Sequence, residues 1–109
     1  MDEIVVFVSC ASEEEAEKIA HGLLESRLAV CINILPSVTS LFSWQGEIHR
    51  DRETLMIIKS LQSVFPVLDE TIKKHHSYEL PEIIALPIIQ GSKDYLDWLR
   101  ESTRPKQQL

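Results

Sequence analysis

The alternation of strand-like and helix-like segments constrains the fold of this chain more than any other feature of its sequence. Continuous apolar runs at Ile4–Val8 and Leu55–Ile58 are typical of strands that are covered on both faces. Apolar residues recur at helical spacing after each run. The expected elements are a strand at 3–11, a helix at 13–27, a strand at 28–35 that continues as extended chain to 44, a strand at 47–60, a helix at 63–75 and a strand at 83–89.

This order predicts an α+β fold, the ferredoxin-like βαββαβ sandwich, because strand crossovers are nearly always right-handed. Two helices then cover one face of an antiparallel sheet. Pro36 and Pro87 cannot donate to a strand ladder and therefore mark the second and fourth strands as the sheet edges. A short extra C-terminal helix capped by Ser92, followed by a polar tail at 105–109, completes a single domain over residues 1–109.

The two middle strands form a hairpin that is too long for the body of the domain. About 14 residues at roughly 3.3 Å each reach about 46 Å, whereas a chain of 109 residues folds to a diameter of about 34 Å. The hairpin carries apolar side chains near its tip: Leu41, Phe42, Trp44 and Ile48. We predict self-association through this arm and the edge strands. The alternative is a bulge that folds the arm back onto its own subunit.

Charge and composition restrict the partners and the compartment. Lys and Arg number 11 against 17 Asp and Glu, a formal net charge of -6, which disfavours nucleic acid and anionic membranes as partners. The chain has no apolar stretch long enough for a signal peptide or a membrane span, so we expect a cytoplasmic protein. Two cysteines in such a chain favour free thiols.

The chain directions of this fold bring three candidate metal ligands to one end of the molecule. Cys10 closes the first strand, and His75 with His76 closes the second helix. One thiol and two imidazoles suit a soft or borderline ion such as copper or zinc. The alternative is structural, because histidines are favoured at helix C-termini and a strand cysteine is commonly a core residue.

Other functions of this fold lack their residues here. RNA-recognition versions need aromatic residues on the central strands, and the run Leu55–Ile58 has none. Copper chaperones carry two cysteines where this chain offers Cys10 alone. Ser12 with Glu15 matches a capping box at the start of the expected helix at 13–27, and the glutamates at 13–15 complement the helix N-terminus. No nucleophilic triad or carboxylate pair is evident, although His75 near Glu79 could move protons, so we expect a binding protein and no enzyme.

The chain resembles the CutA divalent-cation tolerance proteins over most of its length. The resemblance rests on Ala29-Val30-Cys31-Ile32-Asn33, Leu35-Pro36, Thr39-Ser40, Trp44, Gly46, Glu53, Lys59, Tyr78-Glu79, Pro81-Glu82-Ile83, Leu86-Pro87, Gly91, Tyr95 and Trp98. It implies a compact homotrimer similar to PII signalling proteins and a link to copper and divalent-metal tolerance. Some bacterial members are described as binding copper through residues that correspond to Cys10, His75 and His76. Ala11, Ser37 and Ser77 depart from the usual pattern.

Two classes of function follow. The first is a copper-binding homotrimer in metal homeostasis, with Cys10, His75 and His76 as ligands. The second is a PII-like signalling module that holds a small effector in clefts between subunits, lined by Trp44, Lys59 and Tyr78.

Overall fold

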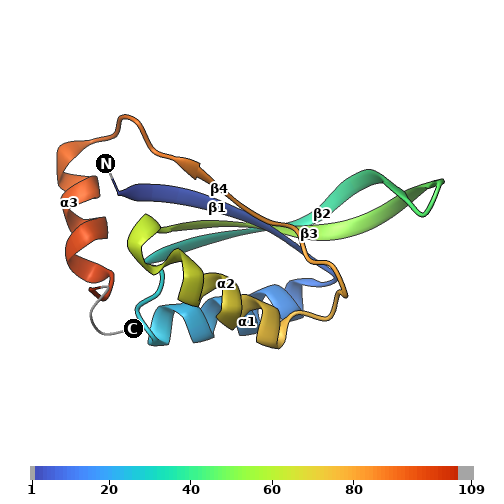
Figure 1. The fold of residues 1–109 in the computed structure, drawn as a ribbon, viewed down its shortest axis with the longest axis horizontal. Coiled ribbons are helices and arrows are strands. Elements are labelled where there is room, and N and C mark those ends of the chain that lie inside the picture. The colour runs from blue at the N-terminus through green and yellow to red at the C-terminus, as the bar shows by residue number, and fades with distance from the viewer. Residues whose placement is uncertain (1, 106–109) are drawn as a thin grey trace.

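The computed structural model describes residues 2–105 and has the predicted order of elements (Figure 1). In chain order these are β1 (Glu3–Cys10), α1 (Glu13–Glu25), β2 (Cys31–Trp44), β3 (Glu47–Leu61), a 3₁₀ turn (Gln62–Val64), α2 (Phe65–His75), β4 (Ile83–Pro87) and α3 (Lys93–Ser102). The α+β ferredoxin-like arrangement with an extra C-terminal helix is therefore confirmed. Of the predicted polar tail, residues 106–109 lie outside the described residues.

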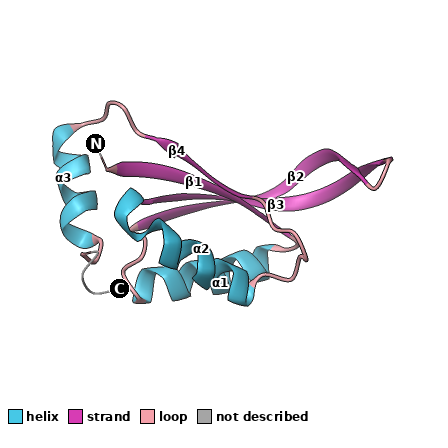
Figure 2. Cartoon of the chain, in the orientation of Figure 1, coloured by secondary structure: helices cyan, strands magenta, loops and turns pink. Residues whose placement is uncertain are grey.

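The four strands form one antiparallel sheet in the order β2-β3-β1-β4, as the prolines predicted. Pro36 lies in a bulge of the edge strand β2, where the register against β3 shifts between Leu35 and Val38. Pro87 ends the other edge strand, β4. Helices α1 and α2 cover one face of the sheet, and α3 lies beside the end opposite the hairpin tip (Figure 2).

The core lies between this face of the sheet and the two helices. Strand side chains alternate between faces, so every second residue of β1 and β3 points toward α1 and α2. Most of the largest fully buried side chains come from these four elements, among them Val6, Val8, Met56, Ile58, Ile19, Leu23, Leu68 and Ile72. Cys10 continues the inward row of β1 and is itself fully buried. The thiol is thereby held at the edge of a rigid core.

Several element ends differ from the predicted ones: β1 and β3 end one residue away, and α2 begins at Phe65, after the 3₁₀ turn, where a start at 63 was expected. Helix α1 ends at Glu25 because Arg27 adopts a left-handed conformation, and Leu28 then donates a hydrogen bond to the carbonyl of Leu23. This is a Schellman motif with arginine in the position that glycine usually takes. Strand β2 consequently begins at Cys31. Strand β4 ends at Pro87, before the predicted residue 89.

The β2–β3 hairpin projects from the body as an arm, which we define as residues 38–53. The molecule measures 43 × 27 × 23 Å, and its long axis runs along the arm (Figure 1). Gln45 and Gly46 turn the chain with φ angles of 52° and 81°. The bulge does not fold the arm back onto the subunit: Leu41 remains 70% exposed and Ile48 84%. Among residues 2–105, no helix is long and apolar enough to cross a membrane.

Candidate metal centre

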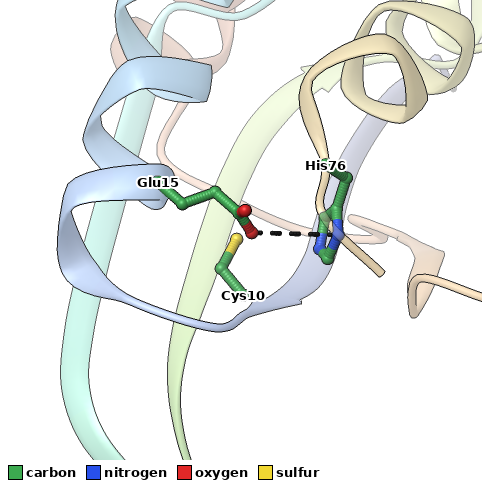
Figure 3. A group of neighbouring side chains, drawn as sticks. All are labelled: Cys10, Glu15 and His76. Atoms are coloured by element: carbon green, nitrogen blue, oxygen red, sulfur yellow. Dashed lines mark ion pairs between the residues drawn. The ribbon is translucent and has the colours of Figure 1, made fainter. Parts of the chain in front are cut away.

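Cys10, Glu15 and His76 converge at the end of the molecule where β1 meets α1 and the chain leaves α2 (Figure 3). The thiol sulfur, a carboxylate oxygen and a ring nitrogen all lie within 4.8 Å of one another. Two of the three predicted metal ligands are thus brought together. The third member of the group, Glu15, was not among the predicted ligands.

Glu15 reaches this position from the first turn of α1. Its backbone N–H donates to Oγ of Ser12 at 3.1 Å, which is one half of the predicted capping box. Its side chain points elsewhere: Oε1 accepts the N–H of Ser77 at 3.2 Å, and Oε2 lies 3.8 Å from Nδ1 of His76. Oε2 is buried and has no hydrogen-bond partner within residues 2–105. Such an oxygen is costly to desolvate unless a cation compensates it.

His76 is held by both of its ring nitrogens. Nε2 lies 2.7 Å from the carbonyl oxygen of Ser9, and Nδ1 accepts the backbone N–H of Tyr78 at 3.1 Å. This pattern assigns the proton to Nε2, and the lone pair of Nδ1 accepts the Tyr78 N–H while Oε2 of Glu15 lies 3.8 Å from the same nitrogen. A carbonyl that fixes the far nitrogen is the usual support of a metal-binding histidine. A metal ion at Nδ1 would replace the Tyr78 N–H.

Cys10 is a neutral thiol in the free protein. Its sulfur lies 3.6 Å from Sδ of Met56 and has no exposed surface. Burial, with smaller contributions from the carboxylates of Glu15 and Glu53, raises the pKa of Cys10 to about 12. Binding of a metal ion to the thiolate would therefore release a proton.

His75 lies outside this group. It is the last residue of α2 and its side chain is exposed. His76 follows the helix in an extended conformation, with φ of -87° and ψ of 140°, and this change turns its ring inward. Because the helix ends between the two residues, their side chains diverge, and one imidazole reaches the thiol.

A cleft of about 690 Å³ borders the candidate metal centre, between the arm and residues 77–82. Trp44 and Tyr78, which we expected in an effector cleft, both line it. Lys59 does not: its ammonium contacts Asn33 and lies 3.9 Å from the sulfur of Cys31. The phenol of Tyr78 donates to Glu53 at 2.7 Å, and burial with this bond raises the pKa of Tyr78. Tyr78 thus links the cleft to His76.

Sequence reasoning missed Glu15 because Ser12 and the three glutamates already had an explanation as a helix cap. The position of Glu15 in the chain was the one signal that could have indicated its place beside Cys10. The first turn of α1 starts three residues after Cys10, so any carboxylate there that turns inward must come close to the thiol.

Comparisons with known proteins identify close relatives of the chain. A family model described as CutA1 divalent ion tolerance protein matches residues 4–102. The divalent-cation tolerance protein CutA of Thermus thermophilus is 50% identical over 101 residues, which are 93% of this chain and 98% of that protein. Human protein CutA is 44% identical over 97 residues, 89% of this chain and 54% of the human protein. The chain thus spans about half the length of its human relative.

Solved structures agree with the architecture. The divalent cation tolerance protein of Thermus thermophilus superposes with a TM-score of 0.92 at 50% identity, covering 94% of this chain and 99% of that one. CutA1 of Oryza sativa superposes with a TM-score of 0.91 at 40% identity, covering 95% of both chains.

Proposed function

Because this chain belongs to the CutA1 divalent ion tolerance family, we propose that it binds copper and contributes to the tolerance of divalent metal ions. One observation carries the proposal. The buried, unpartnered oxygen of Glu15 lies in a group of side chains whose thiol, carboxylate and imidazole donors come within 4.8 Å of one another. A bound cation would compensate this oxygen.

The donor set suits the proposed ion. Imidazole and thiolate are ligands that copper and zinc share, and a carboxylate completes a set for a borderline metal. Cys10 and Glu15 supply the negative charge, and His76 supplies a neutral nitrogen that the Ser9 carbonyl holds in place. His75 stays a candidate from the family resemblance, whereas the geometry favours Glu15.

We propose that the protein acts by binding metal in the cytoplasm, without catalysis, and as a homotrimer. Exposed apolar side chains on the arm and on the edge strand β4 support self-association: Leu41, Ile48, Ile84 and Leu86 are 70%, 84%, 53% and 50% exposed. Light scattering should give a trimer for the wild type. Ile48→Glu should weaken the trimer, and the control Leu24→Glu, at an exposed leucine of α1, should leave it intact. A monomeric wild type would contradict the proposed homotrimer.

Calorimetric copper titration tests the metal site. We expect Cys10→Ala, Glu15→Gln and His76→Ala each to lower copper affinity at least about tenfold, because each removes one donor. Cys31→Ala is the matched control, since it removes the other free cysteine, outside the group. His75→Ala separates the two ligand sets: unchanged affinity supports Glu15 in the third position. Equal affinity of the wild type and the Cys10 variant would contradict the site.

The cleft beside Trp44 and Tyr78 favours a second candidate function, the binding of a small effector. Its volume of about 690 Å³ is that of a small-molecule site. Stabilisation by a metabolite in a thermal-shift screen, with all metal chelated, would support this function. A screen without such a shift would count against it.

A further inference from the structure

The arm has two chemically different faces. Residues opposite each other in the β2–β3 ladder share a face, and successive pairs alternate. One face, called the acidic face here, is formed by the pairs Val38–Glu53, Ser40–Asp51, Phe42–His49 and Trp44–Glu47. The other face carries Arg50 and Arg52 together with Leu41 and Ile48. The arm therefore separates its carboxylates and aromatic rings from its arginines.

Residues of the acidic face line the cleft together with residues 77–80 and Glu82. Four carboxylates line the cleft, from Asp51, Glu53, Glu79 and Glu82. Among the described residues that line it, none is Lys, Arg or His. The low-dielectric walls focus this negative charge on the space between them, so the cleft attracts cations.

Among the four carboxylates of the cleft, that of Glu53 is the one best placed to hold a cation. Its side chain belongs to a residue that is 9% exposed, and one carboxylate oxygen accepts the phenol of Tyr78. Within residues 2–105, no Lys or Arg lies within the 4.0 Å distance of an ion pair with Glu53. A largely buried carboxylate with one neutral hydrogen-bond donor and no Lys or Arg partner gains from a cation placed beside it.

Aromatic rings that line the cleft distinguish an organic cation from a hydrated metal ion. Phe42 and Trp44 on the arm are each 39% exposed, and Tyr78 lines the same cleft. Phe42 also stacks on His49, with ring centroids 5.4 Å apart, which fixes its orientation. The faces of such rings attract ammonium groups and pack against apolar groups. A fully hydrated ion gains nothing from the apolar part of this wall.

We propose that this cleft binds an organic ammonium ion with an apolar or aromatic body. The ammonium group lies against Glu53 and Asp51, and the body packs against Phe42 and Trp44. The inference rests on the second function proposed above, whose effector class it names, and does not require the metal centre.

Three probes of similar shape and different charge test the inference. Phenethylamine, 2-phenylethanol and phenylacetate are titrated into the full-length protein by calorimetry, at one ionic strength and with EDTA present. We expect saturable binding of phenethylamine, with the alcohol and the carboxylate each at least about tenfold weaker. Equal binding of amine and alcohol would overturn the cationic ligand but retain an effector cleft. Absence of amine binding would overturn the inference, while copper binding would remain separately measurable.

Variants locate the amine in the cleft. Glu53→Gln, Asp51→Asn and Trp44→Leu should each weaken phenethylamine binding at least about fivefold, since each removes a charge or an aromatic wall. Glu25→Gln is the control: it makes the same charge change at an exposed position of α1 and should alter affinity less than about twofold. Asp51 is exposed, so its variant remains informative if Glu53→Gln does not fold. If Glu25→Gln lowered phenethylamine affinity as much as Glu53→Gln, the effect would come from net charge alone, and the proposed binding site would be wrong.

Discussion

Two carboxylates near Tyr78, Glu15 with one buried oxygen and the buried Glu53, lie in very different surroundings. Glu15 lies beside a thiol and an imidazole that have no exposed surface. Glu53 lies at the wall of an open cleft lined with aromatic rings. Tyr78 contacts both regions: its backbone N–H donates to His76, and its hydroxyl donates to Glu53.

The surroundings of each carboxylate decide which kind of cation it favours. Around Glu15, donor atoms within 4.8 Å leave room for an ion alone, and their softness selects among metals. Around Glu53, a cleft of about 690 Å³ admits a molecule, and the rings select for an organic body. The two regions should therefore behave as separate sites.

The largest expected effect is the pH dependence of copper binding at the closed site. The pKa of Cys10 is raised to about 12, so the free protein holds the thiol proton at neutral pH and below, while a metal-bound thiolate does not. Copper affinity should therefore rise about tenfold for each pH unit, or about 100-fold from about pH 5.5 to 7.5. Calorimetry in buffers of different ionisation enthalpy should count about one released proton per copper ion.

The control for this prediction is Cys10→Ala, in which the residual copper binding should release about one proton fewer. Proton release that is the same in the wild type and in the variant would show that the thiol is not a ligand.

The second prediction uses Glu15→Gln to separate stability from binding. Gln retains an oxygen for the N–H of Ser77 and removes the negative charge from the unpartnered, buried position. We expect the metal-free protein to become more stable by about 1 kcal/mol, because an uncompensated charge is no longer desolvated. Copper affinity should fall at least about tenfold at the same time.

Urea unfolding with EDTA present measures the first part of this prediction, and copper calorimetry measures the second. Glu14→Gln is the matched control, at an exposed glutamate in the same helical turn, and should change neither quantity appreciably. If Glu15→Gln destabilises the metal-free protein, the carboxylate contributes to folding and its oxygen is not kept unpartnered for a metal.

The fold could be predicted from the sequence because its signals are local and mutually consistent. Apolar runs identified β1 and β3, and the prolines identified the edges of the sheet. The projecting arm could also be predicted, because the expected length of the strands exceeded the expected diameter of the body, and the molecule is indeed elongated. Errors at element ends came from backbone conformations without a clear residue signal, such as the left-handed Arg27.

The candidate sites were predictable only in part, because they depend on side-chain directions. Chain direction brought Cys10 and His76 to one end of the molecule, but the extended backbone after α2 decided which histidine turned inward. Glu15 had a sufficient local role as part of a helix cap, which concealed its tertiary one. The acidic face of the arm required the register of β2 against β3, which the bulge at Pro36 shifts.

The smallest expected effect is the response of the two regions to salt. The acidic cleft is open and its rim residues Glu79 and Glu82 are exposed, so mobile ions screen its field. Raising sodium nitrate from about 0.02 M to 0.2 M shortens the screening length from roughly 20 Å to roughly 7 Å, and phenethylamine affinity should fall about threefold. Copper affinity should change less, because Cys10 and His76 have no exposed surface and are reached by few salt ions. Calorimetry of both ligands across one salt series measures the difference. If copper affinity fell as steeply as amine affinity, the two cations would be competing for the same exposed carboxylates, and the separation between a closed metal centre and an open cleft would fail.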